Sequence, residues 1–320
     1  MKIVRQYEFG GSDVLKIENT DIPSIVAGEV LIKGSYTSVN YADIKGRFGG
    51  KSNGSFPITL GLDIAGIIVE SRTPNFKKGD RVIAFPKNGS YAEYVVATDS
   101  LVYKIPDSLS FEQAAAMPIV SILAYILLSE IGQVKSTDTI VVHSASGGVG
   151  SMLIQLAKFF NVKKIIATVG NIEKSEYVKD LGADVVCHYN NFAEIVLEHT
   201  EQKGAQVIFD SIAGDVTTNS YQCLANYGTL VQFGNSSGRA GVVSTADVHS
   251  SCRSLKGFSL GTTRKSNPER LRLAAETVIK LFANGTLSLT IDSIYNLTEI
   301  KQAHDLMESR SHKGKILIKM

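Results

Sequence analysis

A glycine-rich turn between a strand-like run and an amphipathic run constrains this chain more than any other part of its sequence. The apolar run Thr139-Ile-Val-Val142 is followed by Ala145-Ser-Gly147-Gly-Val-Gly150 and then by a helical pattern that continues to Lys158. This is the spacing G-x-G-x-x-G with alanine in the first position. The second glycine lets the backbone approach a pyrophosphate, the third lets helix and strand pack closely, and the helix N-terminus offers free N–H groups. The segment predicts a dinucleotide-binding junction.

The size and composition of the chain favour two globular domains. The chain has 320 residues, which is about twice the roughly 150 residues of a usual domain. Apolar residues make up 44% and charged residues 20%, which excludes a disordered or fibrous protein. The net charge is +2 and no block of five like charges occurs, so nucleic acid and membrane surfaces are not expected as partners.

Cysteine usage and the apolar segments favour a cytoplasmic protein. Cys187, Cys223 and Cys252 are odd in number and far apart, which suits a reducing compartment better than a disulfide framework. The N-terminus carries charges throughout, so no signal peptide is expected. The longest apolar run, 114–128, is interrupted by Pro118 and is shorter than the roughly 20 residues of a membrane span. We expect a buried helix there.

Apolar strand-like runs alternate with helical patterns from Thr139 to about Gly234, which is typical of a parallel sheet covered on both faces. The expected strands are Ile140–His143, Lys164–Thr168, Ala183–His188, Gln206–Asp210 and Thr229–Phe233. The expected helices lie near 149–160, 172–181, 191–202 and 215–226. A sixth strand over Leu255–Leu260 would complete a doubly wound α/β sheet.

The first 110 residues show short alternating runs separated by Gly, Pro, Asn and Asp turns, and predict a mostly β, partly open barrel. After the sheet domain we expect a helix over 268–283, a strand over 287–294, a helix over 297–309 and a last strand over 315–319. These elements are expected to return to the first domain, with the active site in the cleft between the two domains. The expected boundaries are 1–120 plus 262–320 for one domain and 121–261 for the inserted one.

The end of the second predicted strand bears on the choice of nucleotide. NAD-binding proteins usually place an acid there for the ribose 2′-OH, but Ala167-Thr-Val-Gly-Asn171 contains none. Lys174 and Tyr189 are able to reach a 2′-phosphate by charge or hydrogen bond. Glu173 is counter-evidence, although a first-turn helix acid is its simpler interpretation. We expect NADPH rather than NADH, and a merely solvated Lys174 remains the alternative.

Almost from end to end, the chain resembles the medium-chain dehydrogenase/reductase superfamily. Within it, the chain is similar to the quinone oxidoreductases related to zeta-crystallin. The matching segments in the first half are Val39-Asn-Tyr-Ala-Asp43, 57–66, Gly79-Asp-Arg-Val82, Gly89-Ser-Tyr-Ala-Glu-Tyr94 and 105–116. Those in the second half are 145–150, Lys174, Leu181-Gly-Ala-Asp184, Tyr189, Phe209-Asp-Ser-Ile212 and 228–238. The resemblance implies a GroES-like catalytic domain, an inserted Rossmann domain, NADPH as cofactor and a homodimer.

The resemblance also implies which residues contact the cofactor. They are Ser144, Ala145, Ser146, Gly147, Gly148, Val149, Thr168, Asn171, Lys174, Tyr189, Ser211, Phe233, Gly234 and Lys315.

Zinc-dependent members of the superfamily hold a catalytic zinc with a cysteine and a His-Glu pair near the start of the chain. Here Asn40 stands in place of the cysteine, Leu62 and Asp63 replace the pair, and no cysteine precedes Cys187. Zinc needs thiolate or imidazole ligands. Cys187 and His188 are neighbours on a strand and face opposite sides, so they cannot share a metal. We expect no metal site.

Without a Lewis acid, the substrate must accept hydride readily, as quinones do because the developing oxyanion is delocalised. We predict reduction of a quinone by NADPH, with Asn40 as a hydrogen-bond donor; capping of a short helix at 41–46 is the alternative role of Asn40. Tyr41 and Arg47 are expected to line the mouth of the site. The remaining candidates for the catalytic site are Asp43, Asp63 and Tyr125, and helix packing is the alternative for Tyr125.

Two other functions remain open. A zinc-free reductase of enals, enones or enoyl thioesters would need the same hydride, although Gly234-Asn-Ser-Ser-Gly238 resembles the loop of quinone reductases. A nucleotide-binding protein without catalysis is the second alternative. A short-chain dehydrogenase is disfavoured, because the Tyr-x-x-x-Lys spacing of that class occurs only at Tyr41 to Lys45, before the glycine turn.

Overall fold

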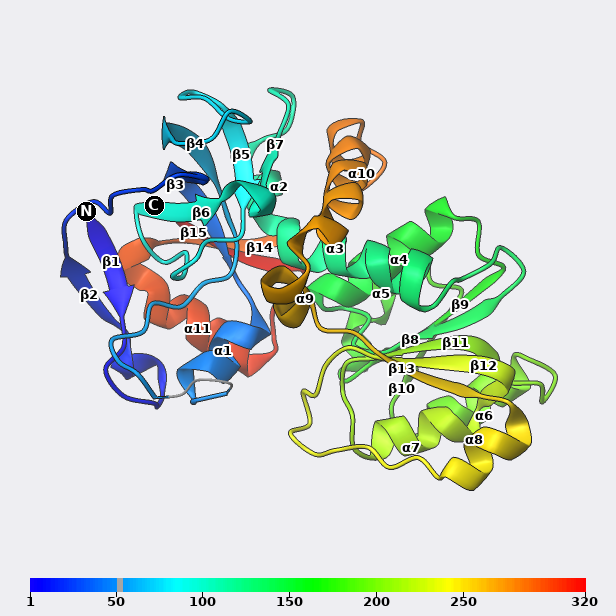
Figure 1. Ribbon diagram of the computed structural model, residues 1–320. Coiled ribbons are helices and arrows are strands. Elements are labelled where there is room, and N and C mark those ends of the chain that lie inside the picture. The colour runs from blue at the N-terminus through cyan, green and yellow to red at the C-terminus, as the bar shows by residue number, and fades with distance from the viewer. Residues whose placement is uncertain (51–53) are drawn as a thin grey trace. The chain divides into compact units, whose positions relative to one another are not determined.

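The computed structural model describes residues 1–50 and 54–320, and the chain forms two units (Figure 1). The outer unit comprises Met1–Ile119 and Arg264–Met320, and the inserted unit comprises Val120–Thr263. Within residues 1–50 and 54–320, no helix has the length and apolar character needed to cross a membrane.

The inserted unit is built on a six-stranded parallel sheet in the order β10-β9-β8-β11-β12-β13. Its strands are β8 (Thr139–Val142), β9 (Lys164–Val169), β10 (Val185–His188), β11 (Ala205–Asp210), β12 (Leu224–Gln232) and β13 (Ser254–Gly257). Its helices include α4 (Gly148–Phe159), α5 (Ser175–Asp180), α6 (Phe192–Glu198), α7 (Asp215–Gln222) and α8 (Thr245–Ser251). This order is that of the doubly wound dinucleotide-binding fold, so the predicted fold class is confirmed.

The outer unit contains a sheet in the order β14-β15-β3-β4-β5-β7, with β6 paired to β3, and a separate hairpin of β1 and β2. Its strands are β1 (Lys2–Arg5), β2 (Lys16–Asn19), β3 (Glu29–Val39), β4 (Ile64–Ser71), β5 (Arg81–Ala84), β6 (Tyr94–Thr98), β7 (Val102–Lys104), β14 (Ile291–Asn296) and β15 (Lys315–Lys319). Its helices include α1 (Tyr41–Arg47), α2 (Phe111–Ala116), α10 (Arg272–Ala283) and α11 (Ile300–Ser309). Strand β15 lies between β14 and β3, so the C-terminal segment completes the sheet of the N-terminal one.

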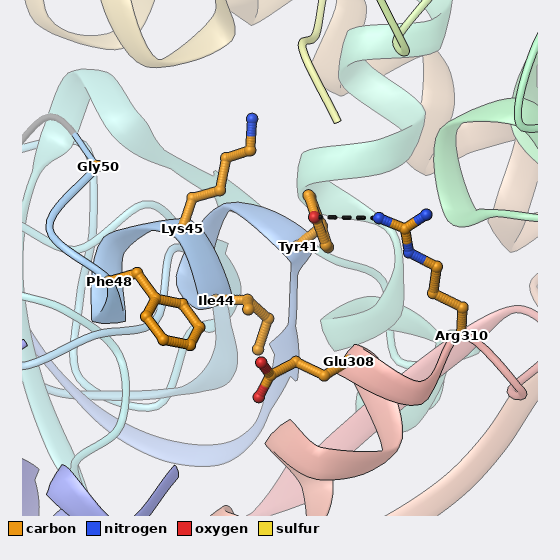
Figure 2. Close-up of a pocket in the computed structure, with 7 residues that line it drawn as sticks. All are labelled: Tyr41, Ile44, Lys45, Phe48, Gly50, Glu308 and Arg310. Carbon is orange, nitrogen blue, oxygen red and sulfur yellow. Dashed lines mark hydrogen bonds between the residues drawn. The ribbon is translucent and has the colours of Figure 1, made fainter. Parts of the chain in front are cut away.

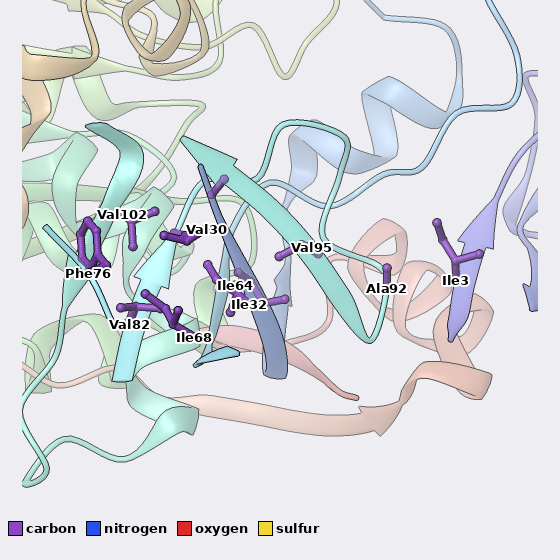
Figure 3. Close-up of a cluster of buried hydrophobic side chains, with 12 residues drawn as sticks. Ile3, Val30, Ile32, Ile64, Ile68, Phe76, Val82, Ala92, Val95 and Val102 are labelled. Atoms are coloured by element: carbon purple, nitrogen blue, oxygen red, sulfur yellow. The ribbon is translucent and has the colours of Figure 1, made fainter. Parts of the chain in front are cut away.

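The core of the outer unit comes from alternate positions on these strands (Figure 3). Val30 and Ile32 are two residues apart on β3 and therefore point to the same face, where they meet Ile64 and Ile68 of β4 and Val82 of β5. All five are fully buried. Burial of one such side chain contributes roughly 1.5–3 kcal/mol, so this face holds the strands in register.

The apolar run at 114–128 is not the single helix that the sequence predicts. It belongs to α2, to α3 (Pro118–Ile126) and to a π-helical turn over Leu127–Ile131. Pro118 has no backbone N–H to donate, so it ends one helix and begins the next. The sequence also does not predict α8, the β1–β2 hairpin or α9 (Leu260–Ser266).

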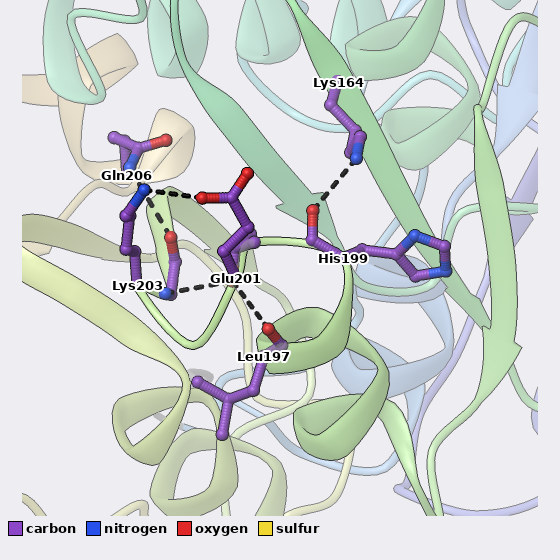
Figure 4. Close-up of polar contacts among 8 residues, drawn as sticks. Lys164, Leu197, His199, Glu201, Lys203 and Gln206 are labelled. Carbon is purple, nitrogen blue, oxygen red and sulfur yellow. Dashed lines mark hydrogen bonds and ion pairs between the residues drawn. The ribbon is translucent and has the colours of Figure 1, made fainter.

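The connection from α6 to β11 is a turn held by backbone hydrogen bonds and by Lys164 of β9 (Figure 4). Glu201 and Gln202 adopt positive φ angles of 53° and 63°. Gln202 N donates to Leu197 O at 2.8 Å, and Lys164 Nζ donates to His199 O at 2.9 Å. A left-handed backbone stops a helix. Helix α6 therefore ends before this turn, and the prediction that it continues through the turn is wrong.

We expect Gly66→Ala to destabilise the outer unit. A Cβ at Gly66 would lie 2.2 Å from Lys33 O, a backbone atom of the paired strand that cannot move without breaking the pairing. The free energy of unfolding should fall by about 3 kcal/mol. In the matched variant Gly34→Ala, the new methyl group meets the side-chain atom Ile64 Cδ1 at 2.7 Å, which is able to move, so the loss should be about 1 kcal/mol. Urea unfolding followed by circular dichroism measures both, and equal losses would contradict this account.

Candidate active site

The glycine-rich turn between β8 and α4 has no room for side chains. A Cβ on Gly150 would lie 2.3 Å from Ser144 O and 2.7 Å from Ala145 Cα, so α4 begins against the backbone of the turn only because this residue is glycine. Ser144 is left-handed with φ 53°, and Gly147 N donates to Ser144 O at 2.9 Å. The first N–H groups of this 12-residue helix have no acceptor within the helix. The turn therefore has the geometry of a pyrophosphate site.

Tyr189 lies against this turn, although it follows β10 and the turn follows β8. Its Oη accepts a hydrogen bond from Ser144 N at 2.7 Å and lies 3.4 Å from Ser144 Oγ. The side chain is partly exposed. The structure thus brings together two residues predicted to contact the cofactor from separate strands.

His143 directly precedes the turn and is fixed by Thr168 and Ser220, and no sequence motif indicates this role. Its Nε2 lies 2.8 Å from Ser220 Oγ, and Ser220 donates its own proton to Val216 O at 2.6 Å, so His143 must donate to Ser220. His143 Nδ1 therefore accepts from Thr168 Oγ1 at 2.8 Å. Burial lowers the pKa of His143 to about 4, against the raising effect of the Asp210 charge. The histidine is neutral and fixed in one tautomer.

Thr168 is placed differently from its predicted role at the cofactor. It is fully buried, and its hydroxyl donates to His143 while its carbonyl accepts from Ala145 N at 3.0 Å. Both polar groups of Thr168 thus fix the turn. Contact between Thr168 and the cofactor stays a prediction.

The segment after β9 carries Asn171, Glu173 and Lys174. Asn171 Oδ1 accepts from Glu173 N at 2.9 Å, and Asn171 Nδ2 donates to Glu173 Oε2 at 3.0 Å. The Glu173 carboxylate is engaged locally, in agreement with its interpretation as a first-turn acid. Lys174 is 9% exposed, so it is not the fully solvated residue of the alternative interpretation.

Ser211 and Gly234 meet beyond the carboxyl ends of β11 and β12. A Cβ on Gly234 would lie 2.8 Å from Ser211 O, so only glycine permits this approach. Phe233 N donates to Asp210 O at 2.9 Å, which joins the two strand ends. In doubly wound sheets, ligands bind outside the carboxyl ends of the strands. The predicted residues of the inserted unit thus gather at the edge where a nucleotide is expected.

In the outer unit, Asn40 lies at the centre of a cluster of polar side chains. It is the N-cap residue of α1 and is 6% exposed. Its Oδ1 accepts from Lys315 Nζ at 2.7 Å. Its Nδ2 lies 3.2 Å from Ser38 Oγ and 3.5 Å from Asp63 Oδ1. One amide group thus connects β3, β15 and the segment before β4.

Asp43 and Asp63 are buried carboxylates beside this amide. Asp43 accepts from Asn40 N at 2.8 Å and Gly61 N at 3.1 Å, and Asp63 accepts from Ser38 Oγ at 2.8 Å. Burial raises the pKa of Asp43 to about 7, and the Asp63 charge adds to this effect. Burial also raises the pKa of Asp63, although Lys315 opposes the shift. The two residues organise the backbone around Asn40.

Arg47 does not line a mouth, contrary to the sequence prediction, because it is fully buried. It donates to Gly10 O at 3.0 Å and forms an ion pair with Glu308. Its Nη1 lies 3.2 Å from His304 Nδ1, which must accept because guanidinium only donates. His304 Nε2 then donates to Tyr91 Oη at 3.1 Å. The Tyr91 hydroxyl in turn bonds the Asp43 carboxylate, so the hydrogen bonds run in one direction from Arg47 to Asp43.

Tyr41 lines a pocket of about 370 Å³ in the outer unit (Figure 2). Its hydroxyl accepts from Arg310 Nη2 at 3.3 Å. The other residues that line the pocket are Ile44, Lys45, Phe48, Gly50, Glu308 and Arg310. Of the two residues predicted at a mouth, only Tyr41 therefore lies beside an open space.

Tyr125 and Lys315 have surroundings that differ from their predicted roles. The Tyr125 ring packs 6.1 Å from the Phe160 ring, which fits the helix-packing alternative. Lys315 belongs to the outer unit, is 2% exposed and bonds Asn40 and Val39, so its ammonium group does not stand open to a cofactor.

Comparisons with known proteins show which family this chain is similar to. The family model described as alcohol dehydrogenase GroES-like domain matches residues 26–107, and the one described as zinc-binding dehydrogenase matches residues 148–276. A probable quinone oxidoreductase of Schizosaccharomyces pombe is 32% identical over 325 residues, which cover 99% of this chain and 96% of that protein. This chain belongs to the quinone oxidoreductase family. The predicted family is confirmed.

Solved structures agree with this membership of the quinone oxidoreductase family. The Escherichia coli quinone oxidoreductase complexed with NADPH is 28% identical, with a TM-score of 0.93 and 100% of both chains covered. A mycobacterial protein complexed with NADPH is 30% identical, with a TM-score of 0.92 and full coverage of both chains.

Asn40, Leu62 and Asp63 are the residues that the sequence resemblance sets at the zinc positions of related dehydrogenases. The Asp63 carboxylate accepts from Ser38 Oγ and Ile119 N. In the part of the chain that the structure describes, no group of three or more His, Cys, Asp or Glu side chains is arranged to hold a metal ion.

The neutral His143 makes stability depend on pH. Its pKa is lower in the folded state, at about 4, than its ordinary value of 6.5, so the unfolded chain binds more protons between these values. The free energy of unfolding should therefore fall as pH drops from 6.5 towards 4, by at most about 1.4 kcal/mol per pH unit from this residue. His304, with its pKa lowered by burial to about 3, adds to the slope.

Urea unfolding of wild type and His143→Gln at several pH values measures this contribution. The variant should be less stable at pH 7 and should show a shallower pH slope. His249→Gln, on the exposed face of α8, is the control and should keep the wild-type slope. An unchanged slope in His143→Gln would contradict the neutral-histidine assignment.

Proposed function

We propose that this protein is an NADPH-dependent quinone oxidoreductase that works without zinc. The observation that carries the proposal is the end-to-end similarity to a relative named probable quinone oxidoreductase, in a chain whose glycine turn has pyrophosphate-binding geometry. The inserted unit is the proposed nucleotide-binding domain, and the outer unit is the proposed catalytic domain.

The cofactor site that we propose uses the strand ends of the inserted unit. NADPH supplies a hydride from C4 of its nicotinamide when it is bound. The backbone of 144–149 would hold the pyrophosphate, because Gly150 allows the helix N-terminus to approach the turn. Asn171, Lys174 and Tyr189 are proposed at the adenosine ribose and its 2′-phosphate, and the strand ends at Ser211, Phe233 and Gly234 at the remaining part of the nucleotide.

Asn40 is the donor that we propose for the substrate oxyanion. Its Nδ2 lies 3.2 Å from Ser38 Oγ, 3.3 Å from Ser38 O and 3.5 Å from Asp63 Oδ1. The contact to Asp63 is the longest of the three, and we propose that a quinone oxygen takes its place. Fixed donors of this kind stabilise charge that develops in the transition state. Asp43 and Asp63 are assigned a positioning role, because both are buried and bond the backbone or side chains around Asn40.

A homodimer is the proposed assembly. Strand β13 is an edge of the parallel sheet, and its Leu255 is half exposed. An unpaired sheet edge with an exposed apolar side chain is suited to pairing with a second copy.

The cytoplasm is the proposed compartment. Cys187, Cys223 and Cys252 form no disulfide, and burial raises the pKa of Cys187 to about 11 and that of Cys223 to about 12. Thiols held in this state suit a reducing compartment.

The proposed activity predicts oxidation of NADPH in the presence of ortho- or para-quinones, with a lower kcat/KM for NADH. The absorbance of NADPH at 340 nm measures the rate across a panel of quinones, 2-alkenals, enones and crotonyl thioesters. Activity restricted to the alkenes would replace the quinone assignment by an enone or enoyl reductase. Tight NADPH binding without turnover of any compound would favour a nucleotide-binding protein.

Lys174→Ala tests the 2′-phosphate assignment. Loss of a charge-assisted hydrogen bond costs about 1.5–3 kcal/mol, so the KM for NADPH should rise about 10- to 100-fold while the KM for NADH stays unchanged. Lys179→Ala, on the exposed side of helix α5, which begins directly after Lys174, is the matched control and should change neither value. Equal increases for both nucleotides in Lys174→Ala would contradict the assignment.

A further inference from the structure

Lys315 is a buried lysine whose position the proposed activity does not yet explain. It is the first residue of β15, is 2% exposed, and its Nζ donates to Asn40 Oδ1 at 2.7 Å and to Val39 O at 3.3 Å. Removing an ammonium group from water costs free energy, so a buried ammonium group needs hydrogen-bond acceptors or negative charges beside it. Here the partners include the residue proposed to bind the substrate.

The Lys315 ammonium group and the capping box of α1 both determine which way the Asn40 amide points, since the Asn40 side chain also accepts from the backbone N–H of Asp43. Lysine carries three donors and no acceptor, so the Asn40 atom that faces it must be Oδ1. Nδ2 consequently faces Ser38 and Asp63. Rotation of the amide by half a turn would place an NH₂ group against the ammonium group, which is repulsive. The amide therefore has one stable orientation.

The same contact polarises the amide. Asn40 lies between a cation at Oδ1 and a carboxylate near Nδ2, with Lys315 on one side and Asp63 on the other. A cation at the oxygen withdraws electron density from the amide and strengthens its N–H groups as donors. Burial lowers the pKa of Lys315, while the Asp63 and Asp43 charges oppose this shift and favour the charged form.

We propose that Lys315 is a positioning residue for the reaction, which holds the Asn40 amide in one orientation and strengthens its Nδ2–H donor towards the developing quinone oxyanion. This inference rests on the proposed function for its kinetic consequence. It assigns Lys315 to the donor side of the site rather than to the nucleotide.

A double-mutant cycle with NADPH and a quinone tests the kinetic part. Lys315→Met should lower kcat about 10-fold with little change in the KM for NADPH, because the Asn40 donor is weakened. In the Asn40→Ala background, the same substitution should change kcat less than twofold, since Lys315 acts through Asn40. Lys319→Met, on the exposed side of β15, is the matched control and should match wild type. Additive losses, or a raised KM for NADPH with unchanged kcat, would overturn the proposal.

The side-chain amide of Asn40 gives a readout that does not depend on turnover. Its ¹⁵N–¹H pair in NMR spectra, identified by its loss in Asn40→Ala, should shift in Lys315→Met and stay in place in Lys319→Met. Lys315→Gln, which keeps a donor but not the charge, serves if the methionine variant fails to fold and should also shift the pair. An unmoved pair would overturn the proposal, whereas a wild-type protein without quinone turnover but with the expected shifts would overturn only the proposed function.

Discussion

The contact between Lys315 and Asn40 joins two segments that are 275 residues apart in the chain, and the polar cluster around Asn40 depends on it. Strand β15 brings Lys315 to the end of β3, where the chain turns into α1. The ammonium group can stay buried only because carboxylates and an amide oxygen surround it, and those carboxylates in turn hold Asn40 and Gly61. The polar cluster around Asn40 therefore contains residues from both ends of the chain, which the inserted unit separates in the sequence.

The nucleotide site proposed in the inserted unit and the donor site proposed in the outer unit depend on different physical features. In the inserted unit the binding surface is backbone, and it exists where side chains are missing: Gly150 and Gly234 allow approaches that a Cβ would block. In the outer unit the surface is a side chain, and Asn40 is fixed by partners that leave it little freedom. A backbone site suits a nucleotide that is the same in every turnover. A side-chain donor suits a position where charge develops during the reaction.

Local sequence patterns indicate the glycine turn of the inserted unit but not the cluster around Asn40. Glycine spacing and apolar runs are local signals, so the doubly wound sheet and the turn at 145–150 follow from short segments, whereas the approach of Ser211 to Gly234 appears only in the structure. The cluster around Asn40 depends on hydrogen bonds between distant residues, and no local pattern indicates that Lys315 belongs with Asn40 or that Arg47 is buried. His143 escapes notice for the same reason, since its partners Thr168 and Ser220 lie on other elements.

The hydrogen bonds from Arg47 to Asp43 all donate in one direction, because the series of bonds begins at a group that can only donate. Arg47 can only donate, which leaves His304 with its proton on Nε2 and makes Tyr91 donate to Asp43. Burial beside Arg47 lowers the pKa of His304 to about 3, so the ring stays neutral and the direction of donation does not reverse near neutral pH. Asp43 thus receives donors from Tyr91, Gly61 and Asn40 together. A carboxylate with three donors holds the loop before α1 in one place, and a fixed loop is what allows Lys315 to meet a single orientation of the Asn40 amide.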